Sequence, residues 1–237
     1  MNVALCISGH LRTIEKCYSS HYDNILKNIN PDVFIHSWSF IESETNSWHK
    51  LHMKNKKIEA NIFKFLEEKY NPKLLKIEDQ INFKLLGNQF GTNISSNGQK
   101  NMTYSAKQSF LLQKDYSIAN NIKYDFIIKI RPDLFIKKDF LKSSLDFEKK
   151  LILFGNKRKK TKYKNKNIGY SALDCLYILN CNNLKENPFF IYDNFNEFYL
   201  RKNYINSPFL DYIIEKNIDF EICNNNLYGN SWIIKRN

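Results

Sequence analysis

The chain has 237 residues, 43% of them hydrophobic and 15% aromatic, and it carries a formal net charge of +12. This length suits one α/β domain, or one domain with a modest insertion, better than two independent domains, and the apolar content excludes wholesale disorder. The positive charge fits nucleic acid, anionic lipid or a phosphorylated small molecule as a partner, and equally a merely basic surface.

Cysteine spacing and hydropathy exclude further classes. The five cysteines are scattered without a CxxC pair, which argues against a disulfide framework and a zinc site. The first apolar run begins at Val3, and Arg12 interrupts it too early for the long hydrophobic region of a signal peptide. No apolar stretch approaches the roughly 20 residues that a membrane-spanning helix needs. We therefore expect a cytoplasmic protein, with any membrane contact peripheral, at the inner face.

The first 36 residues predict a strand, a helix and a second strand. Residues 3–7 form a continuous apolar run that ends at Ser8-Gly9, which is typical of a strand buried on both faces. An imperfect helical stripe over about 13–29 is stopped by Asn30-Pro31, and residues 32–36 form another buried strand. This order predicts a mostly parallel central sheet with helices on both faces.

The pattern over about 40–100 is weaker, and we interpret it as a variable helical insertion in a single domain, 1–237. A helix is predicted over 58–70, with Ile62, Phe63, Phe65 and Leu66 toward the core, and a polar loop over 87–99. The next predicted helix covers about 104–121, with apolar positions at Ala106, Phe110, Leu111 and Ile118.

The clearest segment runs from Tyr124 to Asp133. Apolar strand residues lead directly into Arg131-Pro132-Asp133, and Pro132 cannot donate a ladder hydrogen bond, so the strand should end there. Arg131 and Asp133 then lie at the carboxyl edge of the sheet, where ligands bind in open α/β sheets. Further strands are predicted over 151–154, 172–179 and 218–223, and helices over 189–200 and 208–216.

Two chemistries are open at this corner. The Asp133 carboxylate can hold a divalent cation that bridges two phosphates, because hard cations prefer oxygen ligands. The Arg131 guanidinium can neutralise phosphate charge or orient the carboxylate through a bidentate pair. The structural alternative is an Arg–Asp salt bridge that caps the strand.

A second candidate corner is the turn from Ser8 through Gly9 and His10 to Arg12. Gly9 allows a close approach of backbone amides, Ser8 offers a hydroxyl, and Arg12 lies near a helix N-terminus, which favours anions. The spacing matches neither the dinucleotide motif nor the P-loop, and an ordinary turn is the alternative. His36 ends the second strand and should lie at the same edge.

Two features beyond these corners carry weaker signals. Asp174 enters a predicted strand and can act as a base toward an acceptor hydroxyl, or cap a loop. The basic run 157–166 can guide a phosphorylated acceptor or contact anionic lipid, although such runs are more often solvated loops.

These segments together resemble a known group of proteins. They are similar to WavE-like glycosyltransferases of bacterial and viral polysaccharide synthesis and, more loosely, to the GT-A nucleotide-sugar fold. The resemblance rests on the runs from Val3 to Arg12, from Asp32 to Trp38 and from Tyr124 to Phe135, the last preceded by Gln108 and Ser109. The similarity covers the first 40 residues and about 104–139.

The resemblance implies transfer of a sugar from a nucleoside-diphosphate sugar to a saccharide or lipid-linked acceptor in capsule or lipopolysaccharide synthesis. Ser8, Gly9 and Arg12 would border the nucleotide, and Asp133 would face its diphosphate, with Mn²⁺ or Mg²⁺ as cofactor. Arg131 stands where an Asp-x-Asp metal motif has its first carboxylate, so it can supply the positive charge in place of the metal.

Two rival classes remain open. A nucleic-acid-binding module fits the charge, but no RRM, OB or zinc pattern interleaves basic and aromatic residues, so we expect no nucleic-acid partner. A glycosyltransferase-like protein that binds glycans without catalysis is the other rival, because Arg131 replaces the expected carboxylate.

Overall fold

The protein is described by a computed structural model. The residues described are 1–42, 56–81, 83, 87–88, 95–137, 151–154, 160–163, 166–169, 175–182, 191–199, 208–223 and 232–235.

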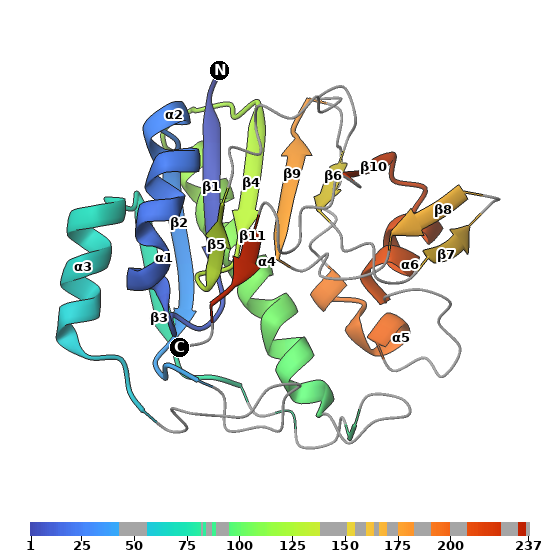
Figure 1. The fold of residues 1–237 in the computed structure, drawn as a ribbon, viewed down its shortest axis with the longest axis horizontal. Coiled ribbons are helices and arrows are strands. Elements are labelled where there is room, and N and C mark those ends of the chain that lie inside the picture. Colours follow the sequence, from blue (N-terminus) through green and yellow to red (C-terminus); the bar gives the residue numbers. More distant parts are fainter. Residues whose placement is uncertain are drawn as a thin grey trace.

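A seven-stranded sheet in the order β10-β6-β9-β4-β1-β2-β3 organises the chain (Figure 1). Every neighbouring pair is parallel except the two that involve β9, so β9 alone runs against the other strands. The predicted α/β class with a mostly parallel sheet is confirmed. The strands are β1 (Val3–Ser8), β2 (Asp32–Trp38), β3 (Leu74–Glu78), β4 (Phe126–Ile130), β6 (Leu151–Phe154), β9 (Leu176–Asn180) and β10 (Phe220–Cys223).

Helices cover both faces of the sheet, as predicted. All six residues of β1 are buried, because alternate side chains enter two separate cores. Leu5 and Ile7 pack with α1 and α3, whereas Ala4 and Cys6 pack with α4, α5 and α6 on the other face (Figure 1). The helices are α1 (Ile14–His21), α2 (Lys27–Ile29), α3 (Ala60–Tyr70), α4 (Ser96–Ala119), α5 (Phe195–Tyr199) and α6 (Pro208–Glu215).

Asparagine residues mark several helix ends. A π-helical turn, η1 (Tyr22–Leu26), joins α1 to α2, so the predicted helix over 13–29 is continuous but not α-helical throughout. Asn30 after α2 and Asn71 after α3 adopt left-handed conformations, with φ of 49° and 42°, and each precedes a proline. A left-handed cap followed by proline ends a helix because the chain cannot continue its hydrogen bonding.

Several predictions between 40 and 121 were wrong. Residues 74–78 form the edge strand β3, which the sequence pattern did not indicate. The long helix α4 begins at Ser96 rather than near 104, with the Ser95 hydroxyl accepting a hydrogen bond from the Asn97 amide as an N-cap. Phe63, expected to face the core, is 37% exposed, and Ile118, one of the apolar positions of the next predicted helix, is 70% exposed, because both lie on the solvent faces of their helices.

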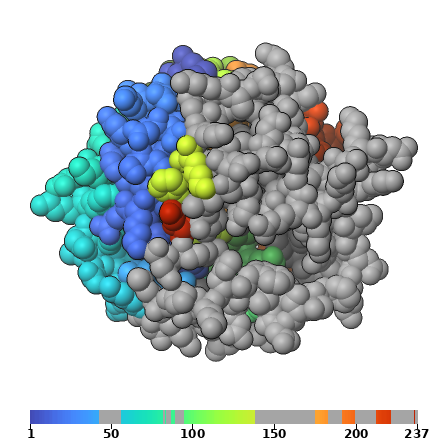
Figure 2. All heavy atoms as spheres, viewed as in Figure 1, coloured from blue at the N-terminus to red at the C-terminus, as the bar shows by residue number. Residues whose placement is uncertain are grey.

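Two small sheets complete the described fold. Strand β5 (Leu134–Ile136) pairs antiparallel with β11 (Trp232–Ile234), so residues near the carboxyl terminus lie beside α1 on one surface (Figure 2). Strand β7 (Lys160–Tyr163), within the basic run, pairs antiparallel with β8 (Lys166–Gly169), which begins at the last residue of that run. Among the described helices, none is long and apolar enough to cross a membrane.

Candidate functional site

The two predicted corners meet at the carboxyl edge of the sheet. Strands β1 and β4 are parallel neighbours, with Ile7 opposite Ile130, so the turns that follow them are adjacent. Gly9 adopts φ of +122°, a conformation that favours glycine, and a Cβ placed there would lie 3.5 Å from Pro132 Cδ. The Gly9 turn therefore packs directly against the Arg131-Pro132-Asp133 corner.

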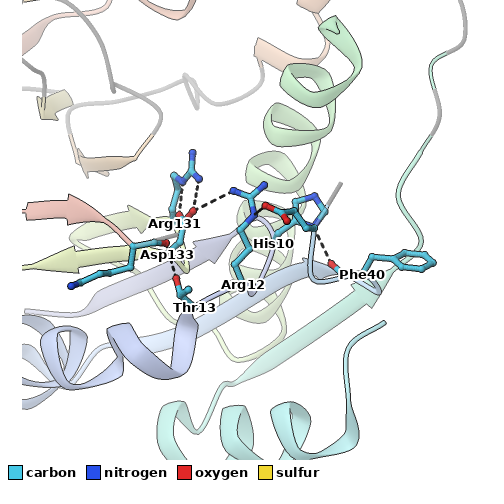
Figure 3. Close-up of polar contacts among 8 residues, drawn as sticks. His10, Arg12, Thr13, Phe40, Arg131 and Asp133 are labelled. Atoms are coloured by element: carbon cyan, nitrogen blue, oxygen red, sulfur yellow. Dashed lines mark hydrogen bonds and ion pairs between the residues drawn. The ribbon is translucent and has the colours of Figure 1, made fainter. Parts of the chain in front are cut away.

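Asp133 is the buried centre of the site. It is 1% exposed, and Arg131 binds it in a bidentate manner, with Nε 2.7 Å from Oδ1 and Nη2 2.7 Å from Oδ2. Arg12 approaches from the other corner, with Nη1 3.5 Å from Oδ2 (Figure 3). Two guanidinium groups from separate chain segments thus converge on one carboxylate.

A second carboxylate joins them. Glu42 lies 3.5 Å from Arg12 Nε, and we refer to Arg12, Glu42, Arg131 and Asp133 together as the Asp133 cluster. The formal charges of its four side chains cancel, but the side chains differ in how exposed they are. The side chains of Arg131 and Arg12 are 18% and 12% exposed, whereas that of Asp133 is 1% exposed. The arginine side chains are thus more exposed than the Asp133 carboxylate that they contact.

Backbone hydrogen bonds hold the Asp133 corner in place. The Arg131 amide donates to the Cys175 carbonyl at 3.1 Å, and the Lys235 amide donates to the Asp133 carbonyl at 2.8 Å. The Thr13 hydroxyl donates to the Lys235 carbonyl at 2.8 Å, which links the start of α1 to the same segment (Figure 3). Lys235, directly after β11, therefore links the Asp133 corner to the start of α1, which follows the Gly9 turn.

The geometry of Asp133 does not fit the metal-ligand role expected from the sequence. Both carboxylate oxygens accept hydrogen bonds from Arg131, and a second guanidinium lies nearby, so an incoming divalent cation would meet two like charges. Within the described residues, no group of three or more His, Cys, Asp or Glu side chains could hold a metal ion.

The Gly9 turn is itself held by β2. The Gly9 amide donates to the His36 carbonyl at 3.3 Å, and the Ser37 hydroxyl donates to the Gly9 carbonyl at 2.9 Å. Ser8 is 3% exposed. The backbone amide of Gly9 and the side chain of Ser8 are therefore directed into the protein, and Arg12 is the residue of this turn that reaches the Asp133 cluster.

His10 bonds the chain that leaves β2. Its Nδ1 lies 2.9 Å from the Phe40 carbonyl oxygen, which can only accept, so Nδ1 carries the proton (Figure 3). Burial, reinforced by the positive charge of Arg12, lowers the pKa of His10 to about 4. His10 is therefore a neutral ring beside the Asp133 cluster at neutral pH.

His36 lies at the same edge but inside the protein. It is fully buried, with Nδ1 2.8 Å from the Ser105 hydroxyl and Nε2 2.9 Å from Glu78 Oε1. Glu78 also pairs with Lys76 at 2.8 Å, and Lys76 donates to Gln108 at 3.0 Å. We call these five residues the His36 cluster. Burial lowers the pKa of His36 to about 4 in spite of the Glu78 carboxylate, so the ring is neutral.

One predicted site residue cannot be placed in the structure, and three residues that contribute to the site were not predicted from the sequence. Asp174 lies outside the described residues. Glu42, Thr13 and Lys235 contribute to the site, yet no motif marked them. Glu42 lies in the weakly patterned region, and the roles of Thr13 and Lys235 depend on a pairing between β5 and β11 that spans about 100 residues of sequence.

The fold matches solved transferase structures. No protein-family model and no curated protein matches the sequence. The inositol-1-phosphate CTP transferase from T. maritima matches with a TM-score of 0.50 and 10% identity, covering 100% of this chain and 89% of that one. This likeness shows a shared fold, and the expected GT-A-like arrangement is confirmed.

Two glycosyltransferase structures give lower scores. The galactosyltransferase LgtC, in complex with donor and acceptor sugar analogues, matches with a TM-score of 0.47 and 11% identity over 93% of this chain and 73% of that one. A glycosyltransferase involved in glycosylation of the major capsid of PBCV-1 matches with a TM-score of 0.41 and 5% identity over 100% of this chain and 96% of that one.

Proposed function

We propose that the protein is a glycosyltransferase that binds a nucleoside-diphosphate sugar where the Gly9 turn meets the Asp133 cluster. The observation that carries the proposal is the convergence of Arg12 and Arg131 at the carboxyl edge of the sheet, in a fold shared with a transferase that uses a nucleotide. Ligands of open α/β sheets bind at this edge. The chain's charge of +12 also favours a phosphorylated ligand.

The arginines would act on the leaving group. In glycosyl transfer the bond between the anomeric carbon and the diphosphate oxygen breaks, and its electron pair stays on that oxygen. The acceptor hydroxyl oxygen bonds the anomeric carbon and gives up its proton. Guanidinium groups held in place before the reaction stabilise the charge that develops on the diphosphate. Asp133 would orient Arg131 without contacting the ligand.

The finer assignments are also proposals. Asp174 is our candidate base for the acceptor proton if the anomeric centre inverts. A saccharide or lipid-linked acceptor, a role in capsule or lipopolysaccharide synthesis, and peripheral contact of the basic run 157–166 with the inner face of the membrane follow from the sequence resemblance and the basic charge.

A panel of donors tests the proposal. Thermal denaturation is measured with UDP-, GDP-, CMP- and dTDP-sugars, with and without Mn²⁺. A donor at 100 times its dissociation constant adds about 2.7 kcal/mol of stability, so a true donor raises the melting temperature by several degrees. Arg131→Gln should lose the shift, and Lys64→Gln, an exposed charge-matched control on α3, should keep it. No shift with any donor would contradict the proposal.

Nucleotidyl transfer is the second candidate, because the CTP transferase shares this fold. The two reactions differ in their products. Glycosyl transfer releases a nucleoside diphosphate or monophosphate from the sugar donor, whereas nucleotidyl transfer releases pyrophosphate from a nucleoside triphosphate. Product analysis with the donor and with the triphosphate therefore separates them, and binding without turnover in either assay would indicate the non-catalytic alternative.

A further inference from the structure

We infer that the Arg12–Arg131 pair takes the place of the divalent cation, so that the protein binds the donor diphosphate without a metal, and that Asp133 is a positioning residue for Arg131. The inference rests on the proposed function and names the groups that recognise the phosphates.

The contacts of Asp133 define its role. Arg131 occupies both carboxylate oxygens at 2.7 Å, whereas Arg12 lies at 3.5 Å from Oδ2 and at 3.5 Å from Glu42. A bidentate pair fixes the plane of the guanidinium as well as its position. Arg131 is therefore held rigidly. The contacts of Arg12 with Asp133 and Glu42 are longer, and a phosphate oxygen can replace them at smaller cost.

The burial of each side chain indicates whether a cation or an anion can bind at this corner. A cation would have to reach a carboxylate that is 1% exposed and already bonded by one guanidinium, with another alongside. An anion would meet the guanidinium groups, which are the more exposed members of the cluster. Charges interact strongly in such partly buried surroundings, so the side of the cluster formed by the two arginines favours an anion, although the formal charges of the four side chains cancel.

The sequence at this corner supports the same conclusion. The resemblance of the sequence to nucleotide-sugar transferases would place Arg131 where an Asp-x-Asp motif supplies its first carboxylate, and Pro132 and Asp133 follow it directly. A carboxylate at 131 would need a cation to offset its repulsion from Asp133. The Arg131 guanidinium carries that positive charge as part of the protein itself, and it forms two hydrogen bonds to the Asp133 carboxylate.

Isothermal titration with inorganic pyrophosphate tests the inference on the whole protein. We expect binding in EDTA with an affinity within about threefold of that in Mn²⁺. Binding that requires Mn²⁺ would overturn the inference and leave the proposed donor site standing. No binding under either condition would overturn both, because the corner would then not be a phosphate site.

Two pairs of variants identify the responsible groups. Arg131→Gln should weaken pyrophosphate binding in EDTA by about tenfold or more, and Lys64→Gln should not. Asp133→Asn keeps an oxygen acceptor for Arg131 and should weaken binding less than Arg131→Gln does, with Asp115→Asn as its control on an exposed face of α4. The reverse ranking of the two site variants would overturn the inference.

A direct measurement with Mn²⁺ alone remains decisive even if a site variant fails to fold. Electron paramagnetic resonance of Mn²⁺ added to the wild-type protein reports free and bound ion. We expect the free-ion signal to be unchanged by the protein in the absence of pyrophosphate. Stoichiometric loss of that signal with the wild-type protein would show bound Mn²⁺ and overturn the inference. Recovery of the free-ion signal with a folded Asp133→Asn variant would then place the ion at Asp133.

Discussion

The Asp133 cluster and the His36 cluster lie at the same edge of the sheet, yet they differ in what is buried at the centre. The first surrounds an ionised carboxylate with two guanidinium groups. The second surrounds a neutral imidazole, both of whose nitrogens have partners within the protein. A buried charge is costly unless it is paired, whereas a neutral ring with two hydrogen bonds is an ordinary part of a core.

This difference distinguishes a residue expected to act in ligand binding from a residue expected to stabilise the fold. Asp133 follows the buried strand β4 and His36 lies near the carboxyl end of the buried strand β2, so both were candidates for ligand binding by position alone. Their contacts distinguish them. The His36 side chain, on β2, forms hydrogen bonds with residues of β3 and α4, and its backbone carbonyl accepts a hydrogen bond from the Gly9 amide. We therefore expect changes at Asp133 to affect turnover first, and changes at His36 to affect stability.

The largest effect is expected from Asp133→Ala. Without the carboxylate, Arg131 loses two hydrogen bonds and its fixed orientation, so turnover with the donor identified in the panel should fall by more than about 100-fold. Circular dichroism checks that the variant is folded, and Asp115→Ala serves as a matched control. Turnover retained in a folded Asp133→Ala variant would remove this residue from the mechanism.

His36→Ala should instead lower the free energy of unfolding by about 2–4 kcal/mol, because it leaves Ser105 and Glu78 without their buried partner. Donor affinity of the folded variant should stay within about threefold of wild type. Ser105→Ala removes the hydroxyl that contacts His36 Nδ1 and the His36 carbonyl but leaves the bond between His36 and Glu78, and it should cost about 1 kcal/mol. A loss of donor affinity larger than the loss of stability would place His36 in the binding site instead.

Stability should fall with acid because His10, His21 and His36 are buried and neutral, each with a pKa lowered to about 4 by burial. As the pH falls from 6.5 toward 4, the unfolded chain takes up protons that the folded chain does not, so the free energy of unfolding decreases. Each histidine contributes a slope of up to about 1.4 kcal/mol per pH unit. Urea denaturation should show that His21→Gln removes one such contribution between pH 6 and 5, and an unchanged slope would contradict the lowered pKa.

The smallest effect is expected from Thr13→Val. The variant keeps the side-chain volume but removes the hydroxyl that donates to the Lys235 carbonyl, which should cost about 1 kcal/mol of stability. If Lys235 links the Asp133 corner to the start of α1, the loss should be accompanied by faster hydrogen exchange of the Lys235 amide, which bonds the Asp133 carbonyl. Unchanged exchange at Lys235 would show that the hydroxyl is not part of that link.

The sequence predicted the elements whose pattern is local. Strands β1, β2 and β4 are rich in apolar residues because they are buried on both faces, and their order along the chain placed the two corners at one edge. Helix α4 was underestimated because its first turns bury polar residues, such as Asn97, Asn101 and Ser105, which carry no apolar stripe. Strand β3 is only partly buried along its whole length, so it lacks the run that marks the central strands.

The site was predictable in position but not in its contacts. The pattern of Arg131 and Asp133 left both a metal site and a bidentate ion pair open, and the structure favours the ion pair. The difference depends on Arg12, which arrives from a turn more than 100 residues earlier, and on the backbone of Lys235 near the carboxyl terminus. Such long-range contacts leave no periodicity in a single sequence.

The central claim concerns where a diphosphate binds, so the most direct test is a crystal structure of the wild-type protein with a bound nucleoside diphosphate, grown in EDTA. We predict that phosphate oxygens lie within hydrogen-bonding distance of the Arg12 or Arg131 guanidinium, while Asp133 keeps its bidentate contact with Arg131. A diphosphate bound elsewhere, with both arginines unchanged, would contradict this account.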